Sequence, residues 1–174
     1  MKIALTGKIC SGKSFVSNML VKEGFSRVGF GDGVKKYCNE LFDMKQKNRK
    51  LLQDFAQSLK EIDKNVWINY LDKYIRTLPI NSNIVVDDLR FPNELNYLKK
   101  NGFIIIKLDV NYELQIERIK KTYPNDYLLH INRLNDISES YINDFEYDYL
   151  FEINSESESN IINSIKNIIN TLHE

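Results

Sequence analysis

The chain of 174 residues has little of what several protein classes depend on. Its two cysteines are too few for a disulfide framework or a thiolate zinc site, and its two histidines offer little to a histidine metal centre. Seven glycines and three prolines leave no room for a long flexible linker. No apolar run approaches the ~18 residues of a membrane helix, and Gly7 and Lys8 end the apolar start too early for a secretory signal. We therefore expect a cytoplasmic, single-domain protein that does not act at a membrane.

The chain also lacks an excess of either positive or negative charge. The chain has 24 basic and 24 acidic residues, which argues against a general nucleic-acid binder. However, residues 1–87 hold 15 basic and 9 acidic residues, whereas residues 88–174 hold 9 and 15. This gradient reflects either chance variation on a solvated surface or a first half that binds an anion.

Short apolar runs alternate with helical patterns along most of the chain. The patterns predict strands at 2–6, 26–30, 83–89, 103–110 and 147–154. Helices are predicted between these runs, and a last amphipathic helix is predicted over 161–172. Residues 31–80 contain helical patterns but no strand, and residues 122–140 are polar and irregular. Strands that alternate with helices indicate an α/β fold with a parallel sheet, here with a helical insertion.

The segment GKICSGKS, residues 7–14, matches the phosphate-binding pattern Gly-x-x-x-x-Gly-Lys-Ser/Thr. It follows an apolar strand and opens a helix, which is the context that the motif requires. Its glycines let backbone N–H groups point at a phosphate, Lys13 can reach the β- and γ-phosphates, and Ser14 can bind Mg²⁺. Cys10 is either a small loop filler or a reactive thiol. The predicted ATP-binding residues are Gly7, Lys8, Ser11, Gly12, Lys13 and Ser14.

Two carboxylates end the predicted strand at 83–89, and an arginine follows. A P-loop enzyme needs an acid near its metal, so one of Asp87 and Asp88 should serve Mg²⁺ while the other contacts the acceptor or caps the next helix. Asp87 is our choice for the metal and Asp88 for the acceptor. Arg90 comes directly after the strand, where a guanidinium could grip a phosphate. Surface or capping roles are the alternatives for all three residues.

Several strings in the same order resemble the deoxynucleoside monophosphate kinases of bacteriophages. They are GKICSGKS, GFGDGVKK, RKLLQDFAQSLKEIDKNVWINYL, VVDDLRFPNEL and ISE, and VVDDLRFPNE is the most specific of them. The resemblance runs from residue 1 to about residue 155. It implies a three-layer P-loop fold with a central parallel five-stranded sheet. It also implies a core of residues 1–30, 81–117 and 140–174, a helical monophosphate-binding insertion at 31–80 and a lid at 118–139.

The resemblance also implies which residues bind the acceptor. These are Asp32, Lys35, Arg49, Gln53, Trp67, Asp88 and Arg90, with Arg49 on the acceptor phosphate and Gln53 on a base edge. Trp67 is more often a core residue than a stacking platform in such a helical pattern.

Arginines of the lid would complete the catalytic set of Lys13, Arg90, Arg118 and Arg133. Arg118 and Arg133 could instead be ordinary surface charges. The sequence departs from the family pattern in one respect, because it has no histidine shortly before Ser138-Glu139. His130 lies too far upstream to replace that histidine, and we expect it on the lid surface.

The implied reaction is transfer of the ATP γ-phosphate, with Mg²⁺, to a deoxynucleoside monophosphate. The acceptor phosphate is already an anion, so positioning and charge neutralisation would provide the catalysis. Two alternatives are another small P-loop kinase, such as dephospho-coenzyme A kinase, and a regulatory module that binds ATP without catalysis. Neither a nucleic-acid polymer nor a membrane is an expected partner, and a homodimer is left open. If the protein is encoded by a phage, its compartment would be the host cytoplasm.

Overall fold

The computed structural model describes residues 1–44, 46, 48–154, 162–165 and 167–168. The chain divides into two compact units. The first consists of Met1–Arg27 together with Asn83–Glu174, and the second is Val28–Ser82. The second unit therefore covers the residues for which the sequence predicts a helical insertion.

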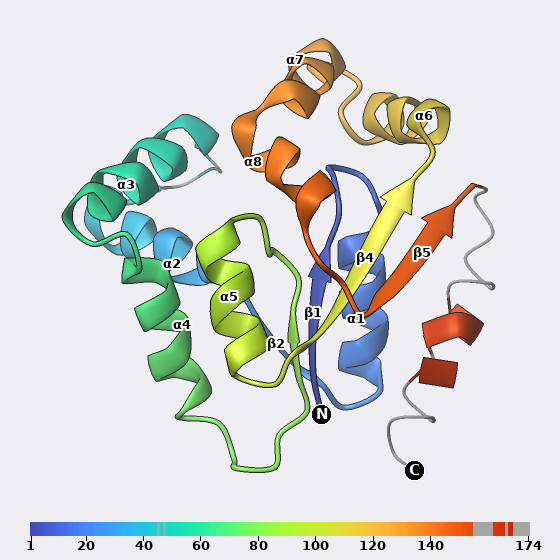
Figure 1. Cartoon of the computed structure of the whole chain (residues 1–174). Helices are drawn as coiled ribbons and strands as arrows, with labels where there is room; N and C mark the ends of the chain where they lie inside the picture. The colour runs from blue at the N-terminus through green and yellow to red at the C-terminus, as the bar shows by residue number, and fades with distance from the viewer. Residues whose placement is uncertain (45, 47, 155–161, 166, 169–174) are drawn as a thin grey trace. The chain divides into compact units, whose positions relative to one another are not determined.

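A five-stranded parallel sheet is the framework of the fold, as predicted (Figure 1). Its strands are β1 (Lys2–Thr6), β2 (Ser26–Val28), β3 (Ile84–Val86), β4 (Ile104–Val110) and β5 (Tyr149–Ile153). Their order across the sheet is β2-β3-β1-β4-β5. Because β1 is central and parallel to both neighbours, the loop after it emerges at the carboxyl edge of the sheet, where α/β proteins bind ligands.

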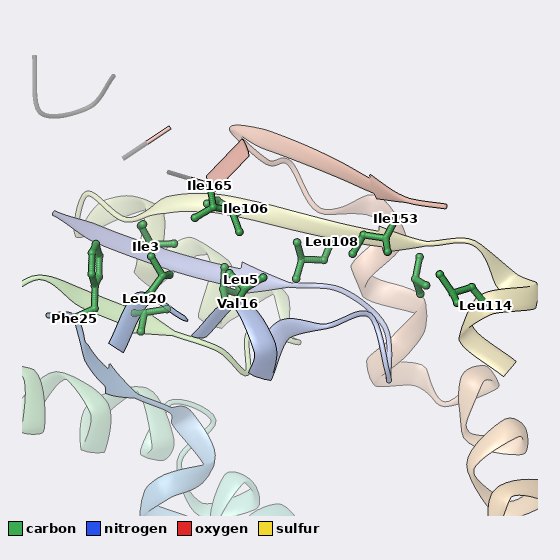
Figure 2. Packing of buried hydrophobic residues seen from close by; sticks show 12 residues of the cluster. Ile3, Leu5, Val16, Leu20, Phe25, Ile106, Leu108, Leu114, Ile153 and Ile165 are labelled. Atoms are coloured by element: carbon green, nitrogen blue, oxygen red, sulfur yellow. The ribbon is translucent and has the colours of Figure 1, made fainter. Parts of the chain in front are cut away.

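The hydrophobic core of the first unit fixes this arrangement. Alternate residues of β1, Ile3 and Leu5, point to one face, where they pack with Val16 and Leu20 of helix α1 (Lys13–Lys22) (Figure 2). All four side chains are completely buried. This packing holds β1, which precedes the phosphate loop, against α1, which follows it, and so fixes both ends of the loop.

Other helices of the first unit follow the sheet strands. They are α5 (Pro92–Lys100), α6 (Tyr112–Thr122), α7 (Tyr127–Asn132) and α8 (Ile137–Ser140), with single 3₁₀ turns at Arg133–Asn135 and Tyr141–Asp144. No helix within the described residues is long and apolar enough to span a bilayer. Of the predicted helix over 161–172, residues 162–165 and 167–168 are helical, and the remainder lies outside the described residues.

The prediction of an irregular segment at 122–140 is wrong, and so is the surface position of His130. The segment contains α7, α8 and a 3₁₀ turn. The His130 side chain has no exposed surface, because its ring stacks on that of Tyr123 at 3.7 Å and its Nε2 lies 3.2 Å from Asp126. A polar sequence thus folds around a buried histidine that stacks on a partly buried tyrosine, a contact that hydrophobic periodicity does not detect.

Helices form the second unit. They are α2 (Phe30–Phe42), α3 (Arg49–Ile62) and α4 (Val66–Ile75). Val34, Cys38 and Trp67 make its buried core, and partly buried side chains such as Phe55 and Leu52 pack against them. The amphipathic pattern of α3 supplies one apolar side to this small core.

Candidate functional site

The loop from Gly7 to Gly12 joins β1 to α1 and has the backbone that the motif requires. Gly7 has a φ of +148° and Gly12 a φ of +97°. A Cβ atom on Gly7 would lie 2.4 Å from the carbonyl oxygen of Leu108 in β4. Only glycine therefore fits where the loop passes β4. Cys10 has a φ of 60°, so its backbone adopts the left-handed conformation that is uncommon for residues other than glycine.

Lys13 points back into this loop. Its ammonium donates hydrogen bonds to the carbonyl oxygens of Gly7 and Lys8, the latter at 2.8 Å. Burial lowers the pKa of Lys13 to about 8, and the nearby Arg90 guanidinium contributes in the same direction. The lowered pKa means that the surroundings disfavour the lysine charge and would favour a neutralising anion.

The first turn of α1 completes an anion-binding arrangement. This turn contains no acidic residue, so the partial positive charge of the helix N-terminus is not neutralised locally. Ser11 is buried in the loop, whereas Ser14 is exposed on the first turn. The Cys10 thiol has a raised pKa because burial disfavours the thiolate, which supports its interpretation as loop filler.

Arg90 is held near the loop by two glutamates. Its Nη1 lies 2.5 Å from Oε1 of Glu139, and its backbone N–H donates to Oε2 of Glu94 at 3.0 Å. Oε2 of Glu139 in turn accepts the backbone N–H of Ile9 at 2.9 Å. Glu139 thereby connects the predicted phosphate-binding arginine to the P-loop.

Helix α6 reaches the same loop from another direction. Nε2 of Gln115 donates to the carbonyl oxygen of Ile9 at 2.7 Å, and Nη1 of Arg118 lies 3.4 Å from the carbonyl oxygen of Cys10. Arg118 is therefore beside the P-loop. Arg133, by contrast, makes no hydrogen bond or ion pair with the P-loop among the residues that the structure describes.

Asp87 follows β3 and pairs with Arg27, which comes from β2. Arg27 donates from Nε at 3.0 Å and from Nη2 at 2.7 Å to the same oxygen, Oδ1. Asp87 also contributes to the charge environment of Lys13, so it lies at the site. Asp88 is half-buried beside it.

The predicted acceptor residues of the second unit lie on two helices. Lys35 and Asp32 form an ion pair at 3.2 Å within α2, Arg49 begins α3, and Gln53 is exposed on α3. Trp67 is 4% exposed, and its indole N–H donates to the carbonyl oxygen of Ala56 at 3.1 Å. Trp67 is thus a core residue, which corrects its inclusion among the acceptor-binding residues.

Sequence reasoning missed Glu139, Gln115 and Arg27. Each contacts a site residue far away in the chain: Glu139 is 130 residues from Ile9, Gln115 is 106 residues from Ile9, and Arg27 is 60 residues from Asp87. For Glu139 alone the sequence offered a signal, because it belongs to the string ISE that resembles the family pattern. That string does not indicate which role the glutamate has.

The site offers two side-chain oxygen donors that could help to hold a metal ion, on Ser14 and Asp87. The described residues contain no group of three or more His, Cys, Asp or Glu side chains that could hold a metal ion. A hydroxyl on an open helix turn and a carboxylate after β3 are oxygen donors of the kind that Mg²⁺ prefers, and phosphate oxygens would supply other ligands.

Comparisons with known proteins identify the family and the fold. A family model described as "AAA domain" matches residues 3–143. A protein of Acanthamoeba polyphaga mimivirus named "Putative deoxynucleotide monophosphate kinase" is 28% identical over a 140-residue alignment that covers 62% of this chain and 72% of that protein.

Solved structures share the fold at low sequence identity. TT1252 from Thermus thermophilus is 15% identical with a TM-score of 0.64, and the match covers 99% of this chain and 97% of that one. Shikimate kinase from Acinetobacter baumannii is 16% identical with a TM-score of 0.58, and the match covers 98% and 93%. The chain therefore shares the fold of these two proteins.

Proposed function

The chain belongs to the AAA domain family, and we propose that it is a phosphotransferase that moves the γ-phosphate of ATP to a deoxynucleoside monophosphate. The observation that carries this proposal is the position of Lys13, with Arg90 and Arg118 beside the same loop. Three cations around one phosphate-binding loop suit a reaction in which negative charge develops on a transferring phosphoryl group.

The fold and one relative support the kinase reaction in different ways. The likeness to P-loop kinases supports a kinase fold, and the printed name of the mimivirus protein supports a deoxynucleotide acceptor. The resemblance of the string VVDDLRFPNE to the monophosphate kinases of phages points to the same acceptor.

We infer the following roles. The loop amides and Lys13 bind the β- and γ-phosphates, while Arg90 and Arg118 neutralise charge on the transferring group. The acceptor phosphate attacks in line and needs no strong base, since it is already an anion. Asp32, Lys35, Arg49 and Gln53 are the proposed acceptor-binding residues, with Asp88 and Arg90, and Arg133 remains a proposed second lid cation.

Mg²⁺ is part of this proposal. Ser14 would hold the ion together with phosphate oxygens, and Asp87 is the proposed carboxylate partner. The ion would neutralise phosphate charge when bound. Because Arg27 already occupies Oδ1 of Asp87, that carboxylate is fixed in orientation before any nucleotide binds.

An acceptor panel tests the function. ADP release from ATP is measured with each deoxynucleoside monophosphate, with dephospho-coenzyme A and with shikimate, in parallel for the wild type and for Lys13→Ala. We expect one or more deoxynucleoside monophosphates to stimulate ADP release by the wild type. In Lys13→Ala the stimulated rate should fall by about 100-fold or more, because the variant lacks a cation that stabilises the transition state. Stimulation by dephospho-coenzyme A or shikimate alone would refute the proposed acceptor, and no stimulation by any of them would favour the regulatory module.

A further inference from the structure

Glu139 is a buried acid at the centre of a site that would bind anions. Its side chain is 4% exposed. One carboxylate oxygen accepts the Ile9 amide of the P-loop at 2.9 Å, and the other lies 2.5 Å from Nη1 of Arg90. Figure 1 shows the helix that carries it, α8, beside the loop after β1. Such a buried carboxylate is stable only when it is paired and hydrogen-bonded, and both of its partners belong to the proposed phosphate-binding machinery.

The tip of the P-loop is held from two sides. The N–H of Ile9 donates to Glu139, and the C=O of Ile9 accepts from Gln115, whose side chain is also buried. Two buried partners on one residue fix the orientation of the peptide units that flank it. The loop tip therefore has little freedom to rotate unless one of these contacts is broken.

Arg90 is likewise held at both ends. Glu94 accepts its backbone N–H and Glu139 binds its guanidinium. An arginine side chain in solution has many rotamers, and immobilising it costs conformational entropy. Glu139 fixes the side chain before substrate arrives, and the guanidinium remains close enough to Lys13 to lower the pKa of that lysine. A carboxylate would repel a phosphoryl group, so a direct catalytic contact is unfavourable for Glu139.

We propose that Glu139 is a positioning residue for phosphoryl transfer, one that holds the Arg90 guanidinium and the Ile9 amide as a single unit and keeps both contacts when nucleotide is bound. This inference rests on the proposed function and adds to it the residue that connects α8 to the P-loop. It differs from an autoinhibitory latch, in which Glu139 would have to release Arg90 before the site could work.

Kinetics of matched variants test the proposal. Glu139→Gln keeps the shape and an acceptor oxygen for Ile9 but loses the charge that holds Arg90. We expect kcat to fall by about 10- to 100-fold, because a displaced catalytic group loses rate, while KM for ATP changes less than about threefold. The matched control is Glu146→Gln, which removes the same charge from an exposed ion pair with Lys99 in the first unit and should leave kcat unchanged.

A double variant separates positioning from general structural support. If Glu139 acts through Arg90, the double variant Glu139→Gln/Arg90→Ala should have a kcat less than about threefold below that of Arg90→Ala alone. The effects of substitutions at two residues that interact do not add. Multiplication of the two single losses, or a wild-type kcat in Glu139→Gln, would overturn the proposal. A rise in kcat or in ATP affinity in Glu139→Gln would also overturn it and would favour the latch.

A measurement on the wild type covers the cases in which a variant does not fold or no acceptor is found. NMR of the Arg90 guanidinium, with ¹⁵N labelling, should show hindered rotation of its Nη groups, both alone and after a non-hydrolysable ATP analogue is added. Free rotation in either state would contradict the proposal. Failure of the wild type to transfer phosphate would refute the proposed function, whereas the NMR result bears on the Glu139 contacts alone.

Discussion

Among the lysines that the structure describes, Lys13 has the pKa that departs furthest from the ordinary value. Its ammonium contacts backbone carbonyls of its own loop, and burial with a neighbouring guanidinium lowers its pKa from 10.5 to about 8. Glu139 and Asp87 offset part of this effect. A phosphate that binds here would raise the lysine pKa again, so binding and protonation of Lys13 are linked.

This linkage predicts that ATP affinity depends on pH. Above about pH 8 the free protein loses the Lys13 charge, so binding must take up a proton and the Kd should rise, approaching tenfold per pH unit well above the pKa. Calorimetry from about pH 7 to about pH 9.5 in two buffers of different ionisation enthalpy measures both the Kd and the proton uptake. Lys13→Arg, which stays charged throughout, should show a flatter profile. A Kd for the wild type that is constant over this range would contradict the assignment.

The lowered pKa of Lys13 also affects the stability of the fold, but stability should increase with pH where ATP affinity decreases. Between the folded pKa of about 8 and the unfolded value of 10.5 the unfolded chain binds more protons at Lys13. The Lys13 contribution to the free energy of unfolding therefore becomes more favourable as pH rises through this window, while nucleotide binding weakens.

Gly7 gives a prediction about stability. Gly7→Ala places a Cβ 2.4 Å from the Leu108 carbonyl oxygen at a φ of +148°, so both strain and a backbone clash oppose it. We expect the free energy of unfolding to fall by about 2–4 kcal/mol, as for other severe core changes. The control is Gly102→Ala, which has a φ of +72° but open space around the new methyl group, and which should cost only about 1 kcal/mol. Equal losses in chemical denaturation would show that the close approach to β4 is not present.

At the scale of elements, the beginning of α5 positions Arg90. Pro92 opens the helix and has no N–H to donate, while the buried Glu94 accepts the N–H groups of Arg90 and Phe91, both at 3.0 Å. This helix start therefore orients the backbone from which the arginine extends.

Loss of the Glu94 carboxylate should weaken both the helix start and the site. Glu94→Ala leaves two N–H groups without an acceptor, and we expect a loss of about 1–2 kcal/mol in the free energy of unfolding. Turnover should fall as well, because the backbone of Arg90 is no longer held. Glu113→Ala, at an exposed first-turn position of α6 where Asn111 supplies the cap, should cost about half a kcal/mol and serves as control. A Glu94 variant with unchanged stability and turnover would exclude this role.

Helix α6 gives the corresponding prediction for Arg118. Its guanidinium lies 3.4 Å from the Cys10 carbonyl, at the edge of the P-loop. Arg118→Ala should lower kcat by about 100-fold and change the Kd for ATP much less, if the arginine acts mainly on the transition state. Arg133→Ala is an informative comparison, because Arg133 has no P-loop contact among the described residues. The opposite pattern, in which Arg118→Ala weakens ATP binding but leaves kcat intact, would remove Arg118 from the catalytic set.

At the scale of the whole molecule, local sequence patterns predicted the sheet and the P-loop, but not the contacts around that loop. The apolar run of β1 and the spacing of Gly7, Gly12 and Lys13 are local features, and periodicity and motif rules detect them. The contacts of Glu139 and Gln115 with Ile9 depend on tertiary folding across more than a hundred residues. His130 was misplaced for a different reason: its stacking partner Tyr123 is close in the chain, but the polar residues around the pair gave no hydrophobic periodicity to indicate burial.

The charge gradient along the chain acquires a partial explanation. Lys13 and Arg27 belong to the basic half, and both lie at the P-loop or next to its neighbouring carboxylate. Arg90 and Arg118, however, come from the acidic half and join the same site. The net charge of each half is therefore a poor guide to the local potential, which folding assembles from both halves.

The central claim is that this chain transfers phosphate from ATP to a deoxynucleoside monophosphate. The most direct test follows the label of γ-³²P-ATP and identifies the product by chromatography. The account predicts that the label appears in a deoxynucleoside diphosphate, in amounts equal to the ADP formed, and that Lys13→Ala abolishes it. Label that appears only as inorganic phosphate, or in a product that contains no nucleotide acceptor, would contradict it.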